Sequence, residues 1–210
     1  MFLFDAPLAL QEYVTHQKVS LADISRAVAS FIAGRRDAVV FGAHAVNAYV
    51  GEPRMTSDID VLSTNAEALA EELRDYLAAK FHIAVRVRAM TKKSAGYRVY
   101  QAMRPKNRAL VDVRQEDNLP ETVSKRGVRF VEPVALLAMK VNSYVARRNQ
   151  VKGDTDRIDI RRMLVTFPKL RKLGGEVTRK LISEGASDDV LKAWYGFVEE
   201  RLDPDADDLT

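Results

Sequence analysis

The sequence of 210 residues contains no cysteine and only three histidines. Without cysteine there is no disulfide framework and no thiolate-ligated zinc site. His16, His44 and His82 form no pair at metal-ligand spacing, which argues against a histidine metal site. No apolar run approaches the ~18 residues of a membrane span, and the first residues lack the pattern of a signal peptide. We therefore expect a cytoplasmic protein with no membrane association.

The composition is that of a folded globular chain. Apolar residues make up 47% and charged residues 30% of the sequence, which argues against disorder. This length suits one domain, or one domain with a small appended lobe.

The net charge of +4 is unevenly distributed. Residues 80–131 contain 13 basic and 4 acidic residues, a net charge of +9, whereas residues 184–210 have a net charge of −7. The basic region favours a polyanionic partner such as RNA, with Lys92 and Lys93 as candidate contacts. Alternatively, the basic residues cover solvated strand faces. Three interleaved aromatic residues fit either a nucleic-acid surface or the core: Tyr97, Tyr100 and Phe130.

The apolar periodicity predicts an α+β fold. Predicted helices run from the Ser20 cap to Gly34 and over 43–50, 66–80, 133–146 and 154–167, followed by two or three short ones. Predicted strands cover 38–41, 59–62, 83–88, 97–103, 109–114 and 128–131. We expect a mixed-sheet domain over residues 1–131 and a helical lobe over residues 132–210.

Most of the candidate functional residues lie near one glycine and two aspartates in the sequence. A buried strand ends at Gly42, where a helix begins, and the free N–H groups of Gly42 and Ala43 at a helix N-terminus suit a phosphate. Asp58 and Asp60 follow at a spacing of two, which places both carboxylates on one side of a strand. Such a pair suits Mg²⁺ or Mn²⁺ shared with phosphate oxygens. Asp112, inside an apolar strand, is the candidate third ligand.

These motifs resemble the DNA polymerase β-like nucleotidyltransferase superfamily. The stretch from Gly42 to Asp60 is most similar to the AbiEii/MenT-type, toxin-like minimal nucleotidyltransferases. Further elements of that branch occur in order up to about residue 165, among them a lysine on a later helix (Lys140) and Asp-x-x-Asp (Asp156 and Asp159). Ala43 stands where the superfamily usually has glycine or serine, so the phosphate contact there would come from backbone N–H groups.

The resemblance implies a metal-dependent enzyme that transfers a nucleotidyl group from an NTP to an acceptor hydroxyl. It implies that Asp58, Asp60 and Asp112 bind the metals, and that Asp112 activates the acceptor. It further implies that Lys140 and Asp156 bind the nucleotide, with Lys140 neutralising the leaving pyrophosphate. The implied acceptor is the 3′ end of a tRNA, with a toxin role and an antitoxin protein as partner. Alternatives are AMP transfer to a small molecule or a protein, and a non-catalytic nucleic-acid-binding module.

Structural roles are the alternative for each site residue. Asp58 and Asp60 could be cap or turn acids, and Asp112 could pair with Arg98 or Arg114.

In the helical lobe, Lys140 could be a surface lysine. Asp156 and Asp159 could stabilise a helix start and pair with neighbouring arginines. Arg54 fits a loop arginine or a phosphate contact, and His44 fits packing against the sheet.

Overall fold

The computed structural model describes residues 19–91 and 95–202, and these fall into two compact units. Of the described residues, the first unit contains those up to His44 and those of Met55–Phe130. The second contains Ala45–Arg54 and the described residues from Val131 onwards. This division differs from the predicted one because residues 45–54 pack with the C-terminal helices.

A seven-stranded mixed sheet forms the first unit. The strands follow each other across the sheet in the order β3-β4-β5-β2-β1-β7-β6. Their bounds are β1 Ala38–Phe41, β2 Ile59–Ser63, β3 Val85–Ala89, β4 Gly96–Gln101, β5 Arg108–Gln115, β6 Thr122–Lys125 and β7 Val128–Val131. Strand β2 runs parallel to β5 and antiparallel to β1, whereas β3, β4 and β5 are antiparallel neighbours. The predicted α+β class with a mixed sheet is confirmed.

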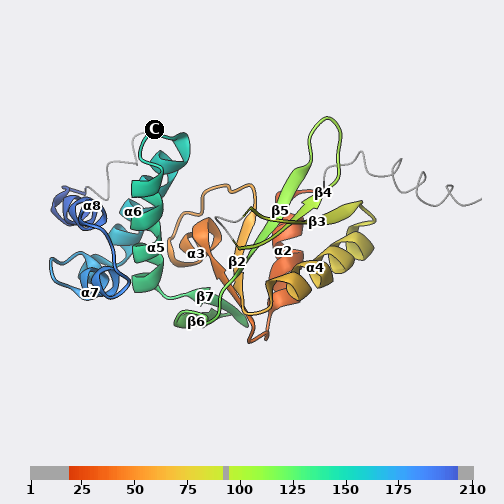
Figure 1. Ribbon diagram of the computed structural model, residues 1–210, viewed down its shortest axis with the longest axis horizontal. Coiled ribbons are helices and arrows are strands. Elements are labelled where there is room, and N and C mark those ends of the chain that lie inside the picture. Colours follow the sequence, from red (N-terminus) through yellow and green to blue (C-terminus); the bar gives the residue numbers. More distant parts are fainter. Residues whose placement is uncertain (1–18, 92–94, 203–210) are drawn as a thin grey trace, which may run out of the picture. The chain divides into compact units, whose positions relative to one another are not determined.

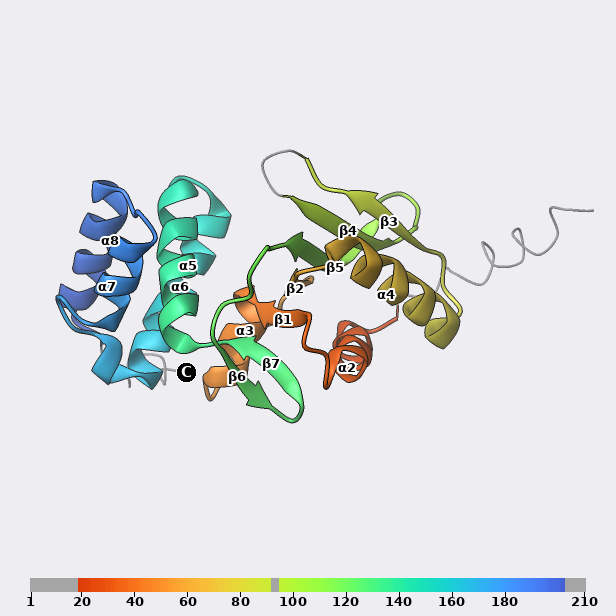
Figure 2. The same ribbon diagram turned by 60° about the horizontal axis from the view of Figure 1, so that its bottom comes forward.

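Helices α2 (Leu21–Ile32) and α4 (Ala66–Phe81) supply the apolar core of this unit. Figures 1 and 2 show both helices beside the sheet. The Oγ atom of Ser20 accepts a hydrogen bond from the backbone N–H of Asp23 at 3.0 Å, which is the predicted cap of α2. Ile59, Val61 and the apolar residues of α2 and α4 share one hydrophobic cluster, so alternate strand residues point away from it.

Strand β6 was absent from the prediction. It is short and mostly exposed, so it carries little apolar signal. Arg126 and Gly127 join it to β7, with φ angles of 52° and 80°. Two consecutive left-handed residues are typical of a two-residue hairpin turn, and the Arg-Gly pair is the signal that would have indicated it.

The second unit is helical. It contains α5 Pro133–Ala146, α6 Val151–Thr166, the short 3₁₀ helix Pro168–Leu170, α7 Glu176–Ser183 and α8 Asp188–Glu199, together with the later part of α3 (Gly42–Tyr49). Helix α5 packs against α6, α7 and α8. Trp194 of α8 is fully buried, and its indole N–H donates to Thr178 Oγ1 at 2.9 Å. Among the described residues, none of the helices is both long and apolar enough to cross a membrane.

Candidate functional site

Gly42 lies where β1 passes directly into α3. All four residues of β1 are buried, and Gly42 has a φ of 65°. A Cβ atom at this position would lie 2.9 Å from Asp60 Cγ and closer still to its Oδ2. Glycine is therefore required both by the left-handed backbone and by the close approach of the Asp60 carboxylate. The predicted phosphate-binding glycine and the predicted metal ligand thus meet at one point.

Asp60 and Asp112 are direct register partners on the parallel strands β2 and β5. Directly opposite residues in neighbouring strands place their side chains on the same face of the sheet. Asp60 is partly buried and Asp112 is 6% exposed. The structure therefore brings these two predicted site residues together, on the face opposite Ile59 and Val61.

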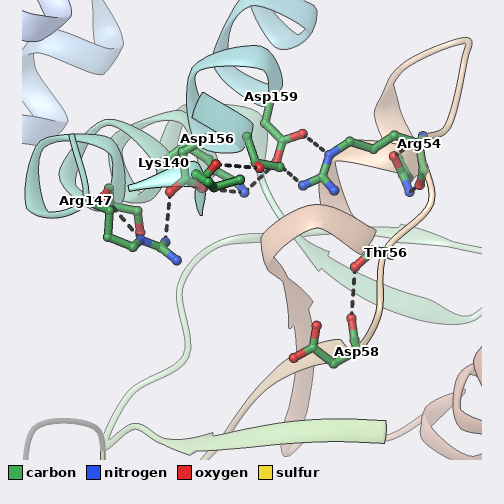
Figure 3. Close-up of polar contacts among 11 residues, drawn as sticks. Arg54, Thr56, Asp58, Lys140, Arg147, Asp156 and Asp159 are labelled. Carbon is green, nitrogen blue, oxygen red and sulfur yellow. Dashed lines mark hydrogen bonds and ion pairs between the residues drawn. The ribbon is translucent and has the colours of Figure 1, made fainter. Parts of the chain in front are cut away.

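Asp58 lies one residue before β2 and is held by the two preceding hydroxyl side chains. Thr56 Oγ1 donates to the backbone carbonyl oxygen of Asp58 at 3.2 Å, as Figure 3 shows, and Ser57 Oγ donates to Asp58 Oδ1 at 2.8 Å. These contacts fix the bend through which the chain enters β2.

Arg98 of β4 binds Asp112 through both of its carboxylate oxygens. Arg98 Nε lies 2.7 Å from Oδ1, and Nη2 lies 2.6 Å from Oδ2. The hydrogen bonds to Asp112 raise the pKa of Arg98, and the charges of Asp58 and Asp60 act in the same direction. All three acids therefore lie within electrostatic reach of one guanidinium. This pairing is one of the two alternatives that the sequence offered for Asp112.

The donor chemistry of this face fits a hard divalent cation. Carboxylate oxygens are the ligands that Mg²⁺ prefers, and Asp58 and Asp60 supply them at the start of β2. No preformed group of three or more metal-ligating side chains occurs in the part of the chain that the structure describes. Arg98 engages both oxygens of Asp112, so a cation that bound this carboxylate would share it with the guanidinium or displace it.

Lys140 lies in the second unit, at the centre of a buried charge network (Figure 3). It is 7% exposed, and its Nζ donates to Asp156 Oδ1 at 3.0 Å and to Asp159 Oδ2 at 2.6 Å. Arg54 binds both oxygens of Asp159 at 2.7 and 2.8 Å. Arg147 Nη2 lies 2.9 Å from Asp156 Oδ2 as an ion pair without hydrogen-bond alignment.

The network changes the pKa of two of its members, Asp159 and Arg54. Burial raises the pKa of Asp159, but the hydrogen bonds and charges of Arg54 and Lys140 outweigh it, so that the pKa is lowered overall. The hydrogen bond to Asp159 raises the pKa of Arg54. Lys140 therefore faces carboxylates rather than solvent, and its predicted contact with a nucleotide, like that of Asp156, stays a prediction.

Sequence reasoning left Arg54, Arg147 and Asp159 without an assigned role. Arg54 and Asp159 are 105 positions apart, so no local pattern connects them. A partial signal exists on α6: Asp156 and Asp159 are spaced by three, which places them on one side of a helix. Two buried acids on one helix face require a cationic partner. Lys92 and Lys93, the candidate RNA contacts, lie outside the described residues.

Comparison with known proteins gives matches among solved structures alone. No protein-family model and no curated protein sequence matches the chain. The Megavirus polyadenylate synthase is 15% identical with a TM-score of 0.56, over 70% of this chain and 32% of its own length. An antigenic nucleotidyltransferase-like protein from Paracoccidioides brasiliensis is 18% identical with a TM-score of 0.44, over 88% and 92% of the two chains. JHP933 from Helicobacter pylori is 14% identical with a TM-score of 0.48, over 85% and 88%.

The likeness to the synthase concerns the fold. It confirms the predicted polymerase β-like nucleotidyltransferase fold. The chain spans about a third of the length of that synthase. The AbiEii/MenT branch stays a prediction.

Proposed function

We propose that this protein is a nucleotidyltransferase that moves a nucleotidyl group from an NTP to an acceptor hydroxyl and releases pyrophosphate. The observation that carries the proposal is the arrangement around Asp60. Its carboxylate lies against Gly42 at the start of α3 and directly opposite Asp112 in the sheet. Transfer of a nucleotidyl group from an NTP to a hydroxyl requires a site that binds phosphate next to acids that can hold a metal ion. The helix start at Gly42 and the two acids supply both.

Each residue has a defined part in this reaction. Asp58, Asp60 and Asp112 would hold Mg²⁺ or Mn²⁺, which supplies charge neutralisation at the phosphates. The N–H groups of Gly42 and Ala43 would bind phosphate oxygens. The acceptor oxygen attacks the α-phosphorus, its proton passes to Asp112, and the bond to the leaving pyrophosphate breaks.

Two residues of the helical unit complete the proposal. Lys140 would neutralise charge on the leaving pyrophosphate, and Asp156 would orient Lys140 through their 3.0 Å contact. The contacts with Asp156 and Asp159 hold the Lys140 ammonium in place before the nucleotide arrives.

For the acceptor, we propose the 3′ end of an RNA, specifically a tRNA. The net charge of +9 over residues 80–131 supports a polyanion. A toxin role with an antitoxin partner rests on the resemblance of the Gly42–Asp60 stretch to the AbiEii/MenT branch.

The test is an incubation of the protein with each of the four α-labelled NTPs, Mg²⁺ and total RNA. We expect label at the 3′ end of a tRNA-sized species, and loss of the label with EDTA. Label in a protein or an added small molecule would replace RNA as the acceptor. No transfer to any acceptor, with a folded protein, would refute the proposed activity.

A further inference from the structure

The edge strand β3 and its neighbour β4 carry a group of arginines on the face of the sheet that bears Asp60 and Asp112. Arg86 lies opposite Tyr100, and Arg88 lies opposite Arg98. Val99, which lies between Arg98 and Tyr100 in the sequence, belongs to the apolar core. Because neighbouring residues of a strand point to opposite faces, the three arginines and Tyr100 point away from that core. Arg98 in turn lies opposite Asp112, which fixes the shared face.

Arg86 and Arg88 differ from most arginines of this protein. Both are exposed, and the described residues offer neither of them a hydrogen bond, an ion pair or a ring contact. Arg35, by contrast, binds Asp37 and Glu72. Arg88 lies opposite Arg98, but the charge of Arg98 is balanced by Asp112. Arg86 and Arg88 are therefore two guanidinium groups of this face that an anionic ligand can engage.

The position of these arginines relates them to the reaction. The register row runs Arg88, Arg98, Asp112, Asp60 across four neighbouring strands. With strands about 4.8 Å apart, the backbone of Arg88 lies about 10 Å from that of Asp112. Arg86 lies about 7 Å from Arg88 along β3. Phosphates held here would belong to the acceptor close to its reactive hydroxyl.

The two arginines without a partner among the described residues favour an anionic acceptor. Arg86 and Arg88 repel a polycationic small molecule such as an aminoglycoside, whereas the charge of Arg98 is balanced by Asp112. A nucleic-acid strand presents successive phosphates to them, and guanidinium is well suited to phosphate. Tyr100, partly buried beside Arg86, offers a ring face on which an unpaired base can stack.

We infer that Arg86, Arg88 and Tyr100, which we term the arginine row, bind a single-stranded nucleic acid next to its 3′ end, the two arginines through its phosphates and Tyr100 through a base. This inference rests on the proposed function, since it defines the acceptor site of the same enzyme. RNA and DNA share the chemistry that the arginine row recognises.

The test measures binding in the absence of NTP and metal, so that it does not depend on catalysis. The probes are fluorescent single-stranded RNA and DNA oligonucleotides, followed by anisotropy from 50 to 300 mM salt. The test variant is Arg86→Gln/Arg88→Gln. The matched control is Lys169→Gln/Lys172→Gln, which removes the same charge at two exposed lysines of the helical unit.

We expect the arginine variant to lose about tenfold or more of its affinity at 0.1 M salt. The slope of log K against log salt is negative, and its magnitude should be smaller by about 1.4 in this variant, as the loss of two phosphate contacts predicts. The lysine variant should bind like the parent. RNA bound more tightly than DNA identifies the acceptor as RNA, and the reverse identifies DNA.

Two results would overturn the inference: equal losses in both variants, which indicate a general charge effect, or a parent protein that labels an aminoglycoside and binds neither oligonucleotide. In the latter case the nucleotidyltransferase proposal stands. Conversely, arginine-dependent binding without any nucleotidyl transfer supports the arginine row and refutes the enzyme.

Discussion

Arg98 and Asp112 lie directly opposite each other on β4 and β5 and are joined by two hydrogen bonds of 2.7 and 2.6 Å. The acid proposed to activate the acceptor is therefore neutralised by a side chain of its own sheet. The guanidinium engages both oxygens through which Asp112 would hold a cation. Binding of a metal at this carboxylate thus competes with an internal ion pair.

Replacing Arg98 tests this competition. In Arg98→Met both hydrogen bonds are lost, and we expect the free energy of unfolding to fall by about 1–2 kcal/mol, because the Arg98 side chain is 47% exposed and partly screened. Mg²⁺ should raise the Tm of this variant more than that of the parent. Arg114→Met, on the neighbouring strand β5, is the control. Equal Mg²⁺ shifts in all three proteins would contradict the competition.

Asp60→Asn should abolish transfer without unfolding the protein. The residue faces the proposed cation site, and loss of a metal ligand removes several kcal/mol of transition-state stabilisation, or a hundredfold or more in rate. Asp117→Asn, at an exposed loop position, should transfer at the parent rate. Initial rates and thermal melts would be compared. A variant that retains parent activity would remove Asp60 from the site, and one that fails to fold would make it structural.

Gly42→Ala should destabilise the sheet unit through two separable effects. The left-handed backbone costs about 1–2 kcal/mol for alanine, and the new Cβ also collides with the Asp60 carboxylate. Gly34→Ala isolates the first effect, since Gly34 has a φ of 78° and no atom lies within 4 Å of the place that its Cβ would take. Denaturant unfolding should show a larger loss for Gly42→Ala. Asp60→Gly in the same chain should recover part of the difference; additive losses would argue against the contact.

Lys140→Met should affect stability as well as rate. It leaves Asp156 and Asp159 short of a buried cation, and breaking a buried ion pair typically costs about 3–5 kcal/mol. Lys152→Met, at an exposed position of α6, should cost little. At a temperature where the variant is folded, turnover should fall by about tenfold to a hundredfold if Lys140 neutralises pyrophosphate. Parent turnover in the folded variant would limit Lys140 to a structural role.

The pH dependence of stability follows from Asp159. Its pKa lies below the ordinary value of 3.8, so the folded state binds this proton less readily than the unfolded state does. The stabilisation is therefore present above pH 3.8 and is lost as the pH falls through the lowered pKa. Asp159→Asn should be less stable by about 3–5 kcal/mol at pH 7, and the difference should shrink in acid. Asp154→Asn is the exposed control; a pH-independent difference would contradict this assignment.

The parts of the site that were predictable depend on local signals. A buried strand ending at Gly42 and an acid spacing of two around Ile59 can be read within a few residues, and Asp112 is conspicuous as an acid among apolar neighbours. The pairing of Arg98 with Asp112 depends on the register between two strands. Composition leaves that register undetermined, so Arg98 and Arg114 were equal candidates. The contact between Arg54 and Asp159 depends on how distant segments fold together.

The path of the chain between the two units limits how the protein can be dissected. It passes from the first unit to the second at residue 45, returns at 55 and leaves again at 131. A fragment ending at residue 131 would keep Arg54 but lose its partner Asp159, and Tyr49 would lose the aromatic contact with Phe167. A fragment beginning at residue 132 would lack the guanidinium that helps to balance Asp159. Neither unit is one continuous segment of the chain. Expression of the helical unit alone, or its recombination with another protein, would therefore require residues 45–54 to be joined to it.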